Sequence, residues 1–240
     1  MTKTIARVRS SDVLLGAWLL VMAGFVDAIA FVVLQGSFVA FMSGNTTILA
    51  SSTATGHWSL AGLSALLICL FFAGCLTGAA IVRWLRSAAH RVLMASIALA
   101  TLAGAIVANT ASAWSGVLML AVVGGLTNSA LATNTDVHVG LTYVTGTLVK
   151  AAHQLVADIR TAHPWSWLAT IGYWFIFAVG ATLGGLAFHR LGTAALWIAV
   201  GLAAVACALP SRAEITGAPI RAKAGAPPSS TPTTEPPQHP

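Results

Sequence analysis

The chain has 240 residues, of which 57% are hydrophobic and only 8% are charged. A soluble domain carries about 25% charged residues, so this chain cannot build a water-facing surface, and we expect an all-α integral membrane protein. The net charge of +6 suggests nucleic acid as a partner, but no basic stripe with interleaved aromatic residues runs along the chain. We therefore expect membrane lipid, and no nucleic acid, as the partner.

Six runs are long and apolar enough to cross a bilayer core, which takes about 20 helical residues. They cover residues 13–34, 60–82, 92–108, 113–132, 167–188 and 193–209. The first follows a basic N-terminus, as a signal peptide would. Its 22 residues exceed the apolar region of a signal peptide, which is about 7–15 residues long. We therefore expect about six transmembrane helices, the first of them retained.

Two weaker stretches, residues 38–57 and 142–160, are rich in Ser, Thr and Gly. If neither crosses the membrane, 11 of the 12 Lys and Arg residues fall on one side and Arg190 alone on the other. Positive charge marks the cytoplasmic side, so this split places both termini in the cytoplasm. If either stretch crossed the membrane, the Lys and Arg residues would be divided more evenly between its two sides. We expect both stretches to form re-entrant or interfacial helices.

Composition changes after the last apolar run. Eight of the nine prolines lie at or beyond Pro210, mixed with Ser, Thr, Ala and Gly. Such a segment cannot bury enough apolar surface to fold. We expect residues 210–240 to be a disordered cytoplasmic tail and residues 1–12 a short cytoplasmic N-terminus.

The remaining chain divides into two similar halves, residues 13–109 and 113–209. Three pairs of segments match in the same order: GFVDA at 24–28 with GLTNS at 125–129, FMSGNT at 41–46 with YVTGTL at 143–148, and the Gly-x-x-x-Gly motifs at 74–78 and 180–184. Three spans per half is an odd number, so the second half must be inverted relative to the first. Inverted repeats are typical of secondary transporters.

Asp27 is the only acidic residue deep within the six apolar runs. A charge at the bilayer centre costs on the order of 3 kcal/mol or more and usually faces protein or water. Asp27 is therefore a candidate proton or cation site, or alternatively a packing residue bonded to a neighbouring polar group. Asn128 holds the matching place in the second half. It cannot titrate, but it could bind Asp27 or a substrate, or only form an interhelical hydrogen bond.

The two Ser/Thr-Gly runs are candidate helix starts within the membrane. A helix N-terminus presents free N–H groups and positive potential, which suits an anion, a carboxylate or a polar solute. The alternative is two ordinary surface helices with Ser or Thr caps. The candidate binding residues are Ser43, Gly44, Asn45 and Thr46 in the first run, and Thr145, Gly146 and Thr147 in the second.

Lys150 and His153 follow the second run and share one helical face. They are a possible proton relay, or else part of a solvated cytoplasmic surface. The paired glycines favour close helix packing, either between the halves or in a homo-oligomer. No catalytic or nucleotide-binding motif is present, and the cysteines lack metal-ligand spacing. We expect no enzyme activity, cofactor or metal.

The motifs together resemble a known family. Gly24, Asp27 and Ala28, then Phe38 and Ser43-Gly44-Asn45, with Gly125, Asn128 and Thr145-Gly146 in the second half, are similar to the YoaK-like bacterial inner-membrane proteins. The resemblance covers about residues 12–209. Ser43 stands where Thr is usual, and Thr127 where Gln often precedes the Asn. The family is a domain of unknown function, so the resemblance implies the bacterial cytoplasmic membrane but no substrate.

Two functions remain open. The first is a secondary transporter or channel-like permease for a small polar or anionic solute, with a midplane site between the halves. The second is a non-transporting scaffold or sensor that oligomerises through glycine-rich helix faces.

Overall fold

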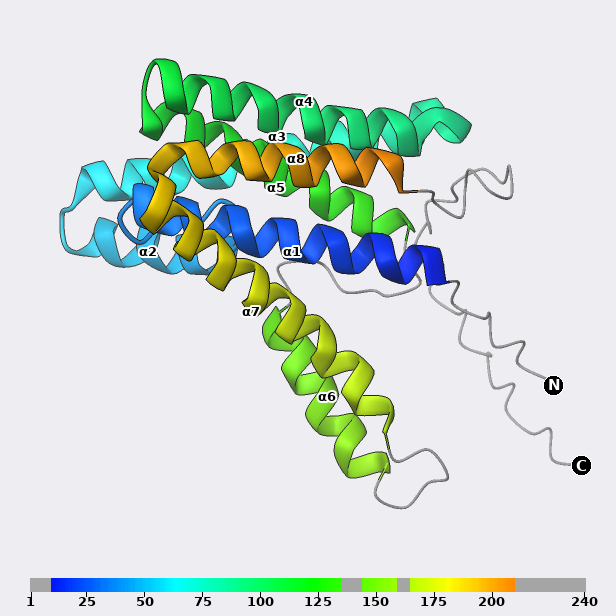
Figure 1. Cartoon of the computed structure of the whole chain (residues 1–240). Coiled ribbons are helices and arrows are strands. Elements are labelled where there is room, and N and C mark those ends of the chain that lie inside the picture. Colours follow the sequence, from blue (N-terminus) through cyan, green and yellow to red (C-terminus); the bar gives the residue numbers. More distant parts are fainter. Residues whose placement is uncertain (1–9, 135–143, 159–164, 210–240) are drawn as a thin grey trace, which may run out of the picture.

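The computed structural model describes residues 10–134, 144–158 and 165–209, and within these residues the only regular structure is helical (Figure 1). Two short 3-10 turns, Arg86–Ala88 and Gly192–Ala195, join pairs of helices. The predicted tail, residues 210–240, and most of the predicted N-terminus lie outside the described residues. The α-helices are α1 Ser10–Val33, α2 Met42–Ala54, α3 Trp58–Leu85, α4 Ala89–Thr110, α5 Ala113–Asn134, α6 Val144–Asp158, α7 Ser166–Leu191 and α8 Leu196–Ala208.

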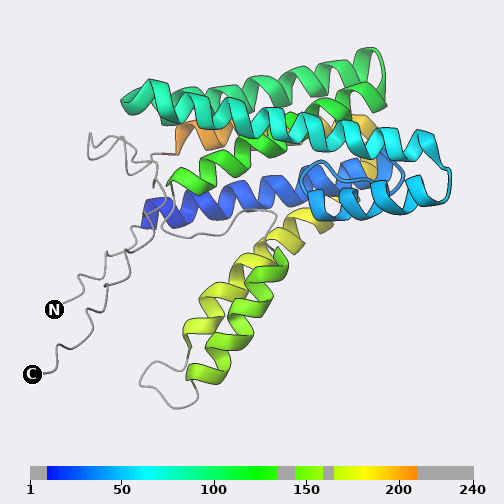
Figure 2. The same cartoon turned by 180° about the vertical axis from the view of Figure 1, so that it is seen from behind.

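Five helical stretches are long and apolar enough to cross a membrane. Four of them, within α1, α3, α4 and α5, coincide with the first four predicted spans. The last two predicted spans form one 43-residue stretch, Ser166–Ala208. Gly192 interrupts this stretch with a φ of 58°, a left-handed conformation that glycine adopts without steric cost. Helix α8 folds back there along the bundle (Figures 1 and 2). The chain is thus a multi-pass helical membrane protein.

The two weaker stretches form the short helices α2 and α6, of 13 and 15 residues. At 1.5 Å per residue they reach about 20 Å and 22 Å, less than the about 30 Å of a bilayer core. Helix α2 runs from the middle of the bundle toward the end where α3 begins (Figure 1). Helix α6 starts near the middle and runs obliquely away from the bundle, alongside the first half of α7 (Figures 1 and 2).

Glycines bring α1 and α7 into backbone contact. A Cβ atom on Gly24 would collide with the carbonyl oxygen of Phe177 in α7. A Cβ atom on Gly180 or Gly184 would in turn collide with the carbonyl oxygens of Val21 and Phe25 in α1. The Gly-x-x-x-Gly motif of α7 is therefore used within the chain.

The same arrangement joins α3 to α5. A Cβ atom on Gly125 of α5 would meet the carbonyl oxygen of Phe71 in α3, and one on Gly74 would meet the carbonyl oxygen of Val122 in α5. Gly78 lies against the side chain of Ser129. In both contacts, a helix of one predicted half thus packs against a helix of the other predicted half. The glycines of both motifs therefore contact helices of the same chain.

Helix α8 fills the space beside α1 and α4. The indole Nε1 of Trp18 in α1 donates a hydrogen bond of 2.8 Å to the carbonyl of Leu202. Thr193, in the turn before α8, donates to the side-chain oxygen of Asn109 at 3.0 Å, and the Asn109 amide donates back to the Thr193 carbonyl at 3.2 Å. These contacts fix the turn between α7 and α8 against the end of α4.

Candidate functional site

The chain leaves helical geometry between α1 and α2. Gln35 and Gly36 have φ values of 51° and 103°, and the Gly36 N–H bonds back to the carbonyl of Phe31 at 2.8 Å. A left-handed glycine with a bond of this kind is a common helix end. Residues 37–41 then follow outside any helix before α2 begins at Met42. This unwound segment passes between α1 and α5.

Asp27 binds the unwound segment. One carboxylate oxygen, Oδ1, accepts hydrogen bonds from the backbone N–H groups of Val39 and Ala40, each at 2.9 Å. The side chain is 5% exposed, so water does not supply these bonds. The structure therefore gives Asp27 two backbone partners.

Asn45 binds the same segment from α2. Its side-chain oxygen accepts from the N–H of Phe38 at 3.0 Å, and its amide donates to the carbonyl of Phe38 at 2.6 Å. Asn45 is fully buried. Together with Asp27 it provides partners for the buried backbone groups of residues 38–40, which would otherwise be costly to leave unpaired.

The starts of α2 and α6 line one cavity. Its volume is about 540 Å³, comparable to that of small-molecule sites in general. Helix α2 and the residue before it contribute Phe41, Met42 and Ser43, and α6 contributes Thr145, Gly146, Val149 and Lys150. The two Ser/Thr-Gly runs, which are about 100 residues apart in the chain, are thus brought together.

The described lining of this cavity carries positive charge and no negative charge. Two helix N-termini open toward it, and each contributes about half a positive charge. Lys150 adds a full positive charge, and none of the described lining residues is acidic. Hydroxyl groups of Ser43 and Thr145 add polar contacts. Such a surface suits an anion or a polar solute rather than a cation.

The other residues of the two runs lie around the cavity without lining it. Gly44 lets the rings of Phe38 and Phe41 pack against its backbone. The hydroxyl of Thr46 donates to its own helix, at the Met42 carbonyl, and Thr147 is buried. His153 is exposed and is not among the cavity residues. The relay predicted for Lys150 and His153 therefore has one member in the cavity and one outside it.

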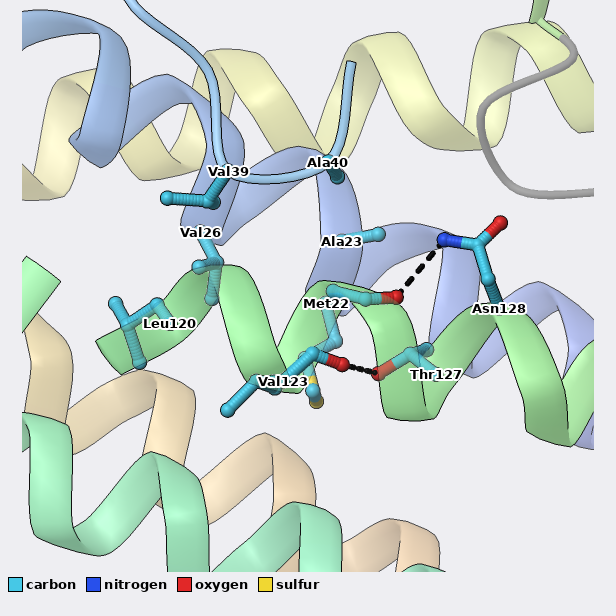
Figure 3. A pocket seen from close by; sticks show the side chains of 10 residues that line it. Met22, Ala23, Val26, Val39, Ala40, Leu120, Val123, Thr127 and Asn128 are labelled. Carbon is cyan, nitrogen blue, oxygen red and sulfur yellow. Dashed lines mark hydrogen bonds between the residues drawn. The ribbon is translucent and has the colours of Figure 1, made fainter. Parts of the chain in front are cut away.

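Asn128 lies at a second, much smaller cavity, where the unwound segment meets α1 and α5 (Figure 3). This cavity offers about 10 Å³ to the centre of a water molecule, roughly the space that one water needs. The Asn128 amide donates to the carbonyl of Gly124 in its own helix at 2.8 Å, and Thr127 donates to Val123 at 2.7 Å. Among the described residues no hydrogen bond joins Asn128 to Asp27.

Sequence reasoning missed the apolar part of the site. Phe41, Met42 and Val149 line the large cavity but were not predicted as site residues. The first two belong to the FMSGNT segment whose likeness to YVTGTL suggested a repeat, so their position in that match was the available signal. Within the described residues no group of His, Cys, Asp and Glu is placed to hold a metal.

The comparisons with known proteins agree with the resemblance in the motifs. Residues 15–209 match the model of the family described as a protein of unknown function, DUF1275, so the chain belongs to this family, and the YoaK-like identification is confirmed. No curated protein matches the chain, and no solved structure does. The site must therefore be interpreted from its own geometry.

Proposed function

We propose that this member of the DUF1275 family is a channel-like permease or secondary transporter for a small anionic or polar solute. One observation carries the proposal: the starts of two short helices, from the two halves of the chain, line a single cavity of about 540 Å³ together with Lys150. Short helices whose N-termini face an anionic substrate group at a repeat interface are a recurrent design of transporters.

The inverted repeat is part of the proposal. The glycine contacts support it, because the contact of α1 with α7 and that of α5 with α3 pair the same motif positions. The neighbours of the two short helices also support it, since α2 packs against α3 and α6 packs against α7, the matching helix of the other half. Under this arrangement the cavity lies at the interface of the halves, near the bilayer midplane.

We further propose six spans, in a bacterial cytoplasmic membrane, with both termini inside. The 3-10 turn and α8 together reach about 28 Å, close to the about 30 Å of a bilayer core. A fluorescent protein fused after Pro240 should then fold in the cytoplasm and fluoresce. If Ser166–Ala208 crossed once, the fusion would be exported, and a phosphatase fused at the same place would be active instead.

The cavity would select solutes by charge. An anion that leaves water loses its hydration, and the helix N–H groups and Lys150 replace that hydration with fixed positive dipoles and charge. The same groups repel a cation. The hydroxyls of Ser43 and Thr145 bind either an anion or a neutral polar solute.

The direct test is flux into vesicles that contain the purified protein. Potassium nitrate, with valinomycin to carry potassium, should swell these vesicles faster than protein-free vesicles do. Lys150→Glu should lower the nitrate rate at least about ten-fold, which corresponds to about 1.4 kcal/mol, because it replaces an attractive charge with a repulsive one. The measurement is stopped-flow light scattering.

Lys150→Arg is the matched control, since it keeps the charge and should keep most of the nitrate flux. Glycerol swelling should change little in either variant. Equal nitrate rates in the parent and in Lys150→Glu, or no nitrate flux above protein-free vesicles, would overturn the proposal.

A further inference from the structure

We infer that Asp27 is a positioning residue, which works as a fixed hydrogen-bond acceptor that shapes one wall of the cavity rather than as a carrier of protons or ions. This inference rests on the proposed function in one respect: the wall matters because solute binds there. Asp27 does not line the large cavity. It acts through the unwound segment, whose last residue, Phe41, does line it.

The geometry of the bonds supports this role. Both backbone N–H groups, of Val39 and Ala40, point at the same oxygen, Oδ1. An amide oxygen in the same place can accept both bonds. The arrangement therefore requires an acceptor of the shape of Asp or Asn, and the negative charge adds strength to the bonds without being essential to them.

Asn45 also holds the segment by hydrogen bonds. The Asn45 side chain accepts a hydrogen bond from the N–H of Phe38 and donates one to the carbonyl of Phe38. Asp27 accepts hydrogen bonds from the next two residues. Irregular backbone inside a membrane is tolerated only where protein or a water-filled cavity satisfies it. Four hydrogen bonds from two buried side chains fix the path of the chain just before Phe41, Met42 and Ser43 reach the cavity.

The second half of the chain offers an internal comparison. Asn128 matches Asp27 in the repeat, so the chain itself places an amide at the equivalent position. An ionised Asp and an Asn differ in charge, but both carry a side-chain oxygen that accepts hydrogen bonds. A group that serves as a hydrogen-bond acceptor can be either.

The test measures how strongly the hydrogen bonds to Asp27 protect the segment. The readout is hydrogen–deuterium exchange of the Val39 and Ala40 amides in the full chain in lipid nanodiscs. Asp27→Ala should speed their exchange by about ten- to hundred-fold, the scale of a lost hydrogen bond to a charged group. Asp27→Asn should change it only a few-fold. Exchange in α4, which Asp27 does not contact, should stay the same and shows that the variants are folded.

Flux supplies the functional readout. Asp27→Ala should raise the nitrate concentration for half-maximal flux, and Asp27→Asn should restore the parent value. Asn45→Ala should act like Asp27→Ala, and the double variant should be less impaired than the sum of the two, because both residues hold one segment. Asn45→Asp, which keeps the acceptor for the Phe38 N–H and loses the donor, should fall between.

Two results would overturn the inference. One is unchanged exchange of Val39 and Ala40 in Asp27→Ala. The other is protected amides in Asp27→Asn together with abolished nitrate flux, which would make the charge itself essential. If no variant and no parent protein conducts nitrate, the proposed function fails, while the exchange rates still decide whether Asp27 and Asn45 hold the segment.

Discussion

Gly184→Ala should destabilise the chain by about 3 kcal/mol, the upper part of the usual range for an overpacked core. The added methyl group would sit against the carbonyl oxygen of Phe25 in α1, far inside the about 3.5 Å at which non-bonded heavy atoms normally meet. Backbone atoms cannot move aside as a flexible side chain can. Helices α1 and α7 must therefore separate along their contact.

Gly185→Ala is the matched control, one position further along the same helix. Nothing lies within 4 Å of a Cβ atom there, so the change should be neutral or should stabilise α7 by up to about 1 kcal/mol through better helix propensity. In detergent, Gly184→Ala should lower the melting temperature by roughly 6–12 °C. Equal melting temperatures for the two variants would show that α1 and α7 do not meet at these glycines.

The spans could be read from the sequence because the bilayer sets a minimum length of apolar helix. Helices α1, α3, α4 and α5 begin and end within a few residues of the predicted runs. The turn at Gly192 was placed well by the gap between residues 188 and 193. Hydropathy alone could not tell whether α8, with 13 residues, crosses separately, because its length falls between that of a span and that of a half-helix.

The partners of the site residues could not be read from the sequence. Asp27 was singled out because a buried acid must have a partner, and it has one. That partner, the backbone 12 and 13 residues further on, exists only because the chain unwinds after Gln35 and Gly36. Sequence spacing does not encode such a path. The cavity that the starts of α2 and α6 line together is likewise set by the tertiary fold.

The contacts of the glycine motifs could also be predicted only in part from the sequence. Four-residue spacing predicted that the helices approach closely, and they do. Spacing could not say which helix each motif meets, since Gly74 and Gly180 have similar surroundings in the sequence. The structure packs the motif of α7 against α1 and the motif of α3 against α5.

A cross-link between Ser43 and Thr145 should stop solute flux, because these residues stand on opposite helices of the one cavity. Both side chains are exposed and accessible to reagents. The parent for this experiment replaces Cys69, Cys75 and Cys207, the free cysteines among the described residues. A bismaleimide that joins the two introduced cysteines would fill the space between the helix N-termini and hold α6 against α2.

The control pairs Thr145→Cys with Thr53→Cys. Thr53 lies on the same helix as Ser43 but ten residues further on, about 15 Å along its axis, and does not line the cavity. This pair should form little cross-link with a short reagent. Each single-cysteine variant, treated with the same reagent, corrects for the effect of attaching one maleimide.

The most direct measurement is nitrate flux before and after bismaleimide treatment of the Ser43→Cys, Thr145→Cys chain in vesicles. We expect a cross-link within one chain, seen as a monomer on a denaturing gel with both thiols blocked, and a fall in flux of at least about ten-fold beyond that of the single variants. A chain that cross-links fully and still conducts nitrate at the parent rate would contradict a solute path through this cavity. Failure of the two cysteines to cross-link would contradict the meeting of α2 and α6 itself.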